Sequence, residues 1–231
     1  MLKQKSTIAF LKRLRLWPNL NAWIVLSGLT ILGWSCTSSG DKLPILGQRK
    51  AVLKTVDGKL VTDSVYHTIP DFNFLSQYGD TVTAKTFANK IYVADFFFTS
   101  CPTICPKMKV QLKRVYEKYK NNPDVALLSH SIDPEHDTVP VLKEFADNLG
   151  ITGRQWLFVT GDREKIYDIG QNSYMVTAQQ DSSAVGGVVH SGAFILIDKD
   201  KHIRGLYDGT TEAGVGKLMN DMDRLLAEYK Q

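Results

Sequence analysis

The sequence predicts an α/β domain built on a mixed sheet, and three observations predict it. An almost unbroken apolar run at 91–98 has the length and composition of a strand buried on both faces. A helical pattern follows, with apolar residues at spacings of three or four from Met108 to Tyr119. Strands and helices then alternate until an antiparallel pair and a closing helix end the chain. Such alternation is typical of a sheet sandwiched between helices.

Two hairpins are expected before the buried strand. Asp57-Gly58 supplies the positive φ angles of a type I′ turn between two apolar-rich segments. A second, smaller hairpin is expected to turn at Gly79-Asp80. The flanking strands are predicted at 52–56, 60–65, 72–78 and 81–83. We interpret both hairpins as additions to the core of the domain.

The elements after the buried strand complete the fold prediction. Asp137 or Thr138 can cap one helix, which has Pro140 in its first turn, and Asp162 can cap the next. Strands are predicted at 125–132, 156–159, 188–197 and 203–207, and helices at 138–149, around 166–169 and at 211–229. This order predicts a thioredoxin-like α/β fold with an added N-terminal β-hairpin region.

The N-terminal segment has the character of a targeting leader. Five basic and no acidic residues precede Cys36, and the apolar run at 22–34 is shorter than the roughly 20 residues of a membrane span. Ser35-Cys36 at its end resembles a bacterial lipoprotein cleavage site, with Cys36 as the lipidated residue, although Trp34 is bulkier than usual there. An uncleaved membrane anchor is the alternative.

This leader predicts how the chain is divided and where it works. We expect a leader or anchor at 1–36, a tether at 37–47 and the working domain at 48–231, held at the membrane on the periplasmic side. The net charge of +4 belongs to the leader, because the residues after Cys36 hold 23 basic against 24 acidic side chains. A nucleic-acid partner is therefore not expected.

The remaining two cysteines predict a chemical site. Cys101 and Cys105 lie where the buried strand meets the first long helix, in Cys-Pro-Thr-Ile-Cys-Pro. A helix N-terminus stabilises a thiolate, and a spacing of four residues brings both sulfurs to one face of the first turn. Two such thiolates suit copper(I), and a nearby imidazole extends the site to copper(II). A structural zinc site is not favoured, because no further cysteine is present to complete four ligands.

A third ligand has to come from five histidines. His67 and His202 lie in apparent hairpin or turn contexts, and His130 lies in or beside a buried strand. His136 follows a predicted strand at the edge of the sheet where functional groups collect. His190 leads into another core strand from a glycine-containing stretch. The spacing alone leaves His136 and His190 open.

The sequence resembles the SCO/SenC family of copper proteins. The resemblance covers roughly residues 65 to 230 and combines four motifs in order. These are Asp95 to Met108 with both cysteines, Ser131 to Asp137, the histidine followed by Ser191, and Gly205 to Gly209.

The resemblance implies a specific site and function. Cys101, Cys105 and His190 would bind one copper ion, and the protein would be a metallochaperone for the dinuclear copper site of cytochrome c oxidase. Its partners would be the copper-site subunit of a respiratory oxidase and a thiol reductant or copper donor. Many members carry an acidic residue before the histidine where this chain has Val189, which removes no ligand but alters its surroundings.

Two other functions are compatible with the same residues. A thiol–disulfide oxidoreductase or peroxidase-like enzyme outside the cytoplasm would use the cysteine pair without His190, although such enzymes typically have two rather than three residues between the cysteines. A redox or copper sensor would bind copper without passing it on.

Overall fold

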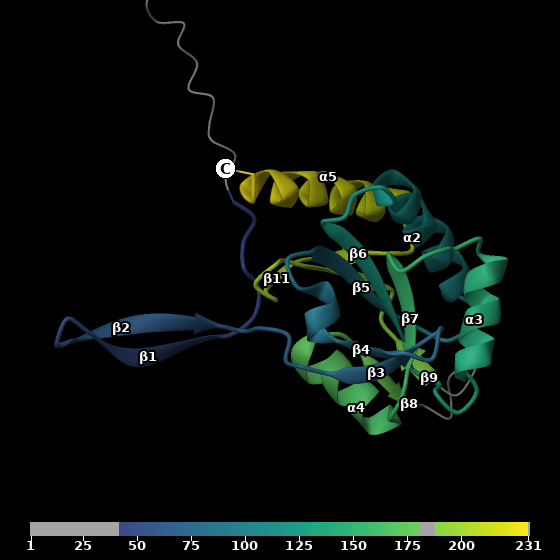
Figure 1. The fold of residues 1–231 in the computed structure, drawn as a ribbon, viewed down its shortest axis with the longest axis horizontal. Helices are drawn as coiled ribbons and strands as arrows, with labels where there is room; N and C mark the ends of the chain where they lie inside the picture. Colours follow the sequence, from purple (N-terminus) through teal and green to yellow (C-terminus); the bar gives the residue numbers. More distant parts are fainter. Residues whose placement is uncertain (1–41, 181–187, 231) are drawn as a thin grey trace, which may run out of the picture. The chain divides into compact units, whose positions relative to one another are not determined.

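The computed structural model describes residues 42–180 and 188–230, and its centre is a seven-stranded mixed sheet (Figure 1). The strand order is β11-β10-β5-β6-β7-β3-β4, in which β5, β6 and β7 run parallel and the other pairs are antiparallel. The predicted thioredoxin-like α/β class is confirmed. The strands are β3 (Asn73–Ser76), β4 (Thr81–Thr83), β5 (Ile91–Phe97), β6 (Val125–Ser131), β7 (Trp156–Thr160), β10 (Ala193–Ile197) and β11 (Ile203–Asp208).

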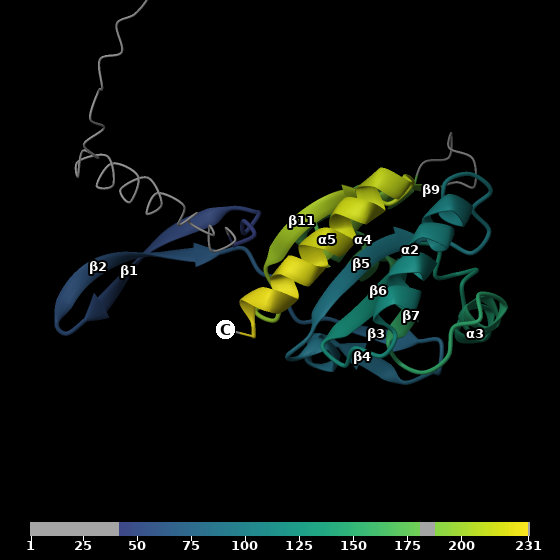
Figure 2. The same ribbon diagram turned by 90° about the horizontal axis from the view of Figure 1, so that it is seen from above.

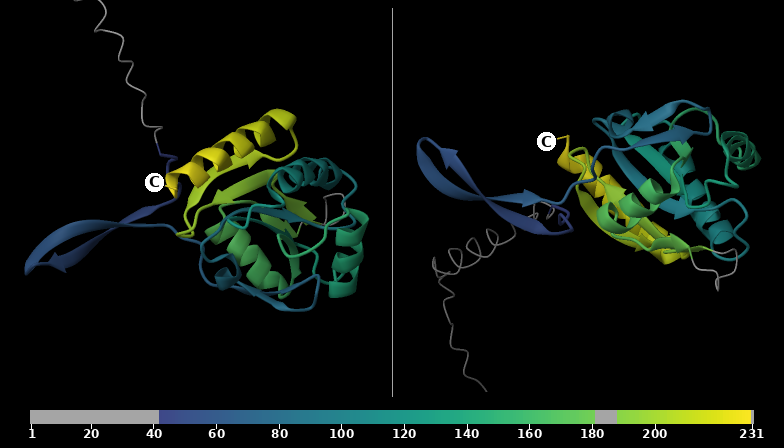
Figure 3. Two further views of the ribbon diagram at one scale, coloured as in Figure 1. Left: turned by 45° about the horizontal axis from the view of Figure 1, so that its top comes forward. Right: turned by 90° about the horizontal axis from the view of Figure 1, so that it is seen from below.

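Helices cover both faces of this sheet. Asp95 of β5 points toward one layer, where its carboxylate bonds Lys109, and Phe96 points toward the other, against Gly170. The first layer holds α2 (Cys105–Tyr119), α3 (Val139–Asn148) and α5 (Glu212–Glu228), and the second holds α4 (Arg163–Asp168) and the π-helical turn η2 (Ile169–Ser173). A short 3-10 turn, η1 (Ala84–Phe87), precedes β5. Figure 2 shows α2 and α5 in front of the sheet, and the right view of Figure 3 shows the opposite face.

Side-chain caps form at two of the four α-helices among the described residues, α4 and α5, and the Asp162 cap of α4 was predicted. The Asp162 carboxylate accepts a hydrogen bond from the Lys165 N–H at the start of α4, and the Thr211 hydroxyl accepts one from the Gly214 N–H at the start of α5. At α3 the N-cap residue is Thr138, whose side chain makes no capping bond, and Asp137 faces elsewhere. Of the two predicted cap candidates, Thr138 therefore holds the N-cap position, whereas the Asp137 carboxylate bonds to the neighbouring site.

The N-terminal hairpin forms where the sequence predicts it. β1 (Arg49–Val56) pairs with β2 (Lys59–Tyr66) from Arg49↔Tyr66 to Val56↔Lys59, leaving Asp57-Gly58 as a two-residue turn with φ of 51° and 75°. These two strands form a sheet of their own. The second hairpin, β3–β4, instead joins the edge of the main sheet.

The predicted strand at 188–197 is wrong in one respect, because it is two strands. β9 (Val188–His190) pairs with β8 (Ala178–Gln180), and only β10 belongs to the main sheet. The break lies at Ser191-Gly192, where the Ser191 N–H donates to the Thr177 carbonyl and the Gly192 carbonyl accepts from Gly209. These hydrogen bonds fix the chain at the point where it passes from the β8–β9 sheet to the main sheet.

The C-terminal part of the predicted tether packs against the domain. Leu43 is buried, its N–H donates to the Glu228 carboxylate over 2.7 Å, and its carbonyl accepts from the Arg204 guanidinium. Leu46 bridges to Ile203 of β11. Residues 43–46 thus pack on the domain. Across 42–180 and 188–230 no helix has the length and apolarity of a membrane span. Cys36 and the leader lie outside the described residues.

Candidate metal and thiol site

The two cysteines lie side by side at the start of α2, but not both on the helix. Cys105 is its first residue, whereas Cys101 lies in the preceding loop, where its N–H donates to the Phe98 carbonyl over 3.3 Å. The expectation of one helical turn carrying both sulfurs is therefore wrong. Pro102 accounts for this, because a proline disfavours helical backbone in the residue before it. Neither cysteine is in a disulfide, and both are buried, with 7% of Cys101 and 3% of Cys105 exposed.

The loop makes the two thiols electrostatically unequal. Burial opposes ionisation of Cys101, but hydrogen bonds from the Cys105 thiol, the Cys105 and Thr103 N–H groups and the Thr103 hydroxyl together lower the pKa of Cys101. The Thr103 oxygen lies 3.6 Å from the Cys101 sulfur. Burial, followed by the bond that Cys105 gives to Cys101, raises the pKa of Cys105 well above its usual range. The predicted thiolate stabilisation is confirmed in direction for Cys101 and wrong for Cys105.

Asp137 fixes the turn that leads into Cys101. Its buried carboxylate accepts hydrogen bonds from the Thr99 N–H over 3.1 Å, from the Thr99 hydroxyl and from the Ser131 hydroxyl. A charged acceptor strengthens each bond. Sequence reasoning assigned Asp137 only as a candidate cap, although it closes one of the recognised motifs. Its side chain joins the ends of β5 and β6 beneath the site.

A buried ion pair lies behind Cys105. Lys109, one turn along α2, places its ammonium 2.8 Å from the Asp95 carboxylate, and both side chains are nearly inaccessible to solvent. The Ser129 hydroxyl accepts from Lys109 over 3.2 Å and from the Trp156 indole over 2.9 Å. The Lys109 charge favours the Cys105 thiolate, although burial outweighs it. No sequence signal identified this pair, because its members are 14 positions apart on different elements.

The backbone after His190 approaches the start of α2. β10 runs antiparallel to β5, so its N-terminal end lies at the carboxyl end of β5, from which Cys101 follows. A methyl group at the Cα of Gly192 would lie 3.8 Å from Ile104 Cδ1 and 2.9 Å from Thr210 Cγ2. The chain two residues after His190 therefore borders the residue before Cys105. The side chains of His190 and Val189 lie outside those the structure describes.

The other histidines occupy separate places. His136 is exposed in the turn after β6. His67 bonds the Ser173 carbonyl over 2.7 Å, and His202 lies 3.4 Å from Asp198. His130 is fully buried, and neither ring nitrogen has a hydrogen-bond partner among the described residues. It is structural, as predicted, but not satisfied by hydrogen bonds.

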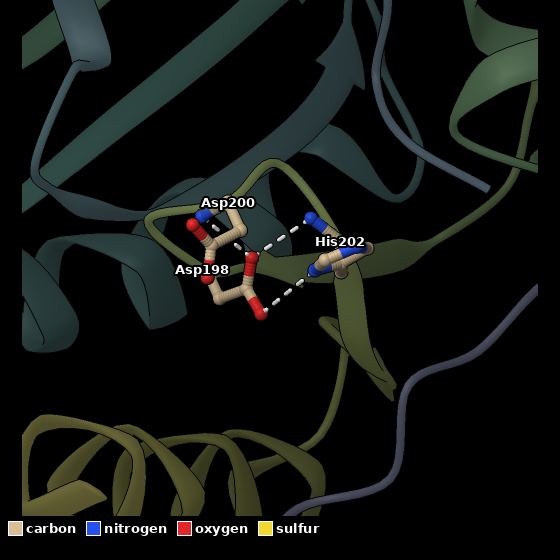
Figure 4. A group of neighbouring side chains, drawn as sticks. All are labelled: Asp198, Asp200 and His202. Carbon is tan, nitrogen blue, oxygen red and sulfur yellow. Dashed lines mark hydrogen bonds and ion pairs between the residues drawn. The ribbon is translucent and has the colours of Figure 1, made fainter. Parts of the chain in front are cut away.

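Asp198, Asp200 and His202 form the one group of three metal-type ligands among the described side chains (Figure 4). The Asp198 carboxylate accepts from the N–H groups of Asp200 and His202 and from the Arg204 guanidinium, the last over 3.1 Å. These bonds hold the turn between β10 and β11. The Arg204 charge balances Asp198, so the cluster has a structural explanation and points to no ion.

A mostly apolar cleft of about 430 Å³ opens beside the cysteines, between α2 and α3. Lys109 and Lys113 contribute its cationic groups. Cys101 and Cys105 both contribute to the lining of this cleft. Its other lining residues are Phe98, Thr99, Pro106, Val110, Phe145, Asn148 and Leu149.

Comparison with known proteins places these features in one family. The family model for SCO1/SenC matches residues 61–227. The SCO1 protein homologue of Bacillus subtilis is 29% identical over 167 residues, which cover 71% of this chain and 86% of that protein.

Solved structures agree with this match. A SCO1/SenC family lipoprotein from Bacillus anthracis superposes with a TM-score of 0.64 at 28% identity, covering 69% of this chain and 95% of that one. BsSco, a Sco family cytochrome c oxidase assembly protein with a disulfide switch, gives 0.61 at 28% identity, covering 69% and 93%. Arabidopsis thaliana ScoI with copper bound gives 0.58 at 26% identity, covering 69% and 98%.

Proposed function

The chain belongs to the SCO1/SenC family, and from this premise we propose that it carries copper for cytochrome c oxidase assembly. Cys101, Cys105 and His190 bind one copper ion and deliver it to the dinuclear copper site. One observation carries the proposal: two buried thiols that are not joined in a disulfide share a hydrogen bond at the start of α2, and the chain just after His190 borders the same helix start.

The donor set favours copper over harder metals. Two thiolates are soft ligands, and an added imidazole accommodates both copper oxidation states. Copper-bound structures of relatives in Arabidopsis thaliana and yeast support the same metal. The Asp137 carboxylate fixes the cysteine loop to the sheet, whereas among the described strands β9 pairs only with the three-residue strand β8. We infer that His190 leaves the copper first and opens a coordination position to the acceptor's ligands.

Copper titration of the reduced protein tests the three ligands. The wild type should bind one equivalent, His190→Ala should weaken binding at least about tenfold, and Cys101→Ser should weaken it more. His136→Ala is the matched control, because His136 is exposed in the turn after β6. Equal affinities of the two histidine variants, or loss of binding only in His136→Ala, would refute His190 as the third ligand.

The unequal thiols also favour a second candidate function, thiol–disulfide exchange. The lowered pKa of Cys101 suits an attacking thiolate, and the buried Cys105 suits a resolving thiol. BsSco, in which a disulfide switch is known, supports the same pair chemistry. Disulfide reduction that continues unchanged in His190→Ala would favour this function, and activity lost with copper binding would favour the carrier.

We further propose that Cys36 anchors the chain to the outer face of the membrane as a lipidated residue. The related Bacillus anthracis protein is a lipoprotein, which supports this assignment. Anchoring places the copper site beside a membrane-bound oxidase. Cys36→Ser should release the mature chain into the soluble fraction, and retention at the membrane in that variant would instead indicate an uncleaved anchor.

A further inference from the structure

The β1–β2 hairpin exposes an unusual amount of apolar surface. Every residue of the two strands is exposed except the half-buried Tyr66. An isolated two-stranded hairpin is at best marginally stable in water. The exposed apolar side chains are Val52, Leu53, Val56, Leu60, Val61 and Val65, from 38% to 72% accessible. β1 also lies before the residues that the family model matches, so this surface is not explained by the shared copper-site fold.

One face of the hairpin combines valines with lysines. The register places Lys50 opposite Val65, Lys54 opposite Val61 and Lys59 opposite Val56 on the same face. Valine methyl groups can enter the boundary of a bilayer while the longer lysine side chains reach the lipid phosphates. The eight residues of this face are Lys50, Val52, Lys54, Val56, Lys59, Val61, Asp63 and Val65.

Charge distinguishes the hairpin from the rest of the chain after Cys36. Residues 49–66 hold four basic and two acidic side chains, a net charge of +2. The other residues after Cys36 hold 19 basic and 22 acidic side chains, a net charge of −3. An anionic surface therefore attracts the hairpin and repels the rest of the domain.

The length of the chain limits how far the hairpin can lie from an anchor at Cys36. Bonds from Leu43 to Glu228 and Arg204 hold the chain to the domain seven residues after Cys36. Seven extended residues span at most about 25 Å. An eight-residue strand is about 26 Å long. The anchored chain thus keeps Leu43, six residues before the hairpin begins at Arg49, within about one strand length of the lipid surface.

We propose that the β1–β2 hairpin binds the anionic phospholipid surface of the membrane that anchors the protein. The inference rests on the Cys36 anchor proposed above. Contact at the hairpin as well as at the anchor restricts rotation of the domain, and so presents the cysteine site to a membrane-bound acceptor in a limited range of orientations.

Amide hydrogen exchange of the full chain in vesicles tests the proposal. The chain is reconstituted in phosphatidylcholine vesicles with and without phosphatidylglycerol. Flotation with the vesicles measures whether the chain is anchored to lipid. The rate of amide exchange across residues 49–66 measures whether the hairpin contacts the lipid. Phosphatidylglycerol should slow exchange about tenfold. Replacing the hairpin's three lysines (Lys50→Gln, Lys54→Gln, Lys59→Gln) should abolish the slowing, and the same change at Lys85, Lys165 and Lys230 should preserve it.

Each other outcome overturns the inference in a distinguishable way. Flotation without slowing keeps the anchor and removes the lipid contact. Slowing that survives the hairpin substitutions shows that the lysines do not carry it. Protection that rises with protein concentration in the absence of phosphatidylglycerol identifies a second copy of the chain as the partner. Failure to float refutes the anchor, and the hairpin inference with it.

Discussion

The buried His130 should make the free energy of unfolding depend on pH, and the size of this effect follows from its burial in the structure. Its ring has no accessible surface, stacks on Phe96 at 4.9 Å between centroids and has no hydrogen-bond partner for either nitrogen among the described residues. Burial lowers its pKa from 6.5 to about 3. The folded protein therefore keeps His130 neutral down to low pH. Other aromatic neighbours are Phe72, Phe74 and Tyr174.

The sign follows from proton binding. Between pH 6.5 and about 3 the unfolded chain binds a proton at His130 and the folded chain does not, so stability falls as the pH is lowered. At pH 5, 1.5 units below the unfolded pKa, this residue costs about 2 kcal/mol relative to pH 8. His130→Phe keeps an aromatic ring and removes the titration. The variant should therefore lose about 2 kcal/mol less than the wild type between pH 8 and pH 5.

Urea unfolding at pH 8 and pH 5 gives the free energy of unfolding that each protein loses on acidification. The prediction concerns the difference in this loss between the wild type and His130→Phe. The comparison cancels any constant effect of the substitution on packing. His136→Phe is the control, because His136 is exposed and should leave the pH dependence unchanged. If wild type and His130→Phe lose the same free energy on acidification, His130 is not held neutral and the reasoning is refuted.

Three further predictions concern the cysteine site. Lys109→Met should lower the free energy of unfolding in urea by about 3–5 kcal/mol, because it leaves Asp95 charged and buried without its partner. Asp137→Asn should cost about 1.5–3 kcal/mol in the same assay by weakening the charged hydrogen bonds to the turn before Cys101. In reduced protein, iodoacetamide should modify Cys101 before Cys105, because the lowered pKa gives Cys101 more thiolate at any pH below its usual value of 9.0.

Substitutions in exposed ion pairs are the controls for Lys109→Met and Asp137→Asn. Lys118→Met and Asp147→Asn each break a surface ion pair and should cost under about 1 kcal/mol. Costs for Lys109→Met and Asp137→Asn that match these controls would contradict the assigned roles. Mass spectrometry of partly alkylated protein identifies the first modified cysteine, and equal labelling of both would contradict the inequality.

The local signals in the sequence predicted most elements because they depend on neighbouring residues. The turn chemistry of Asp57-Gly58 and the capping residues Asp162 and Thr211 act within a few positions. Local signals did not predict the break between β9 and β10 at Ser191-Gly192, because the break depends on hydrogen bonds to the distant residues Thr177 and Gly209. The apolar pattern of 188–197 is the same whether the segment forms one strand or two.

The sequence by itself determined the α/β class and the family to which the chain belongs, and it singled out the two cysteines of the proposed copper site. Only the tertiary structure placed Cys101 outside the helix, made the two thiols unequal and moved Asp137 from the start of a helix to the turn beneath the site. It also paired Lys109 with Asp95. The physical reason is that burial and hydrogen bonding depend on which distant residues meet, whereas spacing along the chain records only which residues are neighbours.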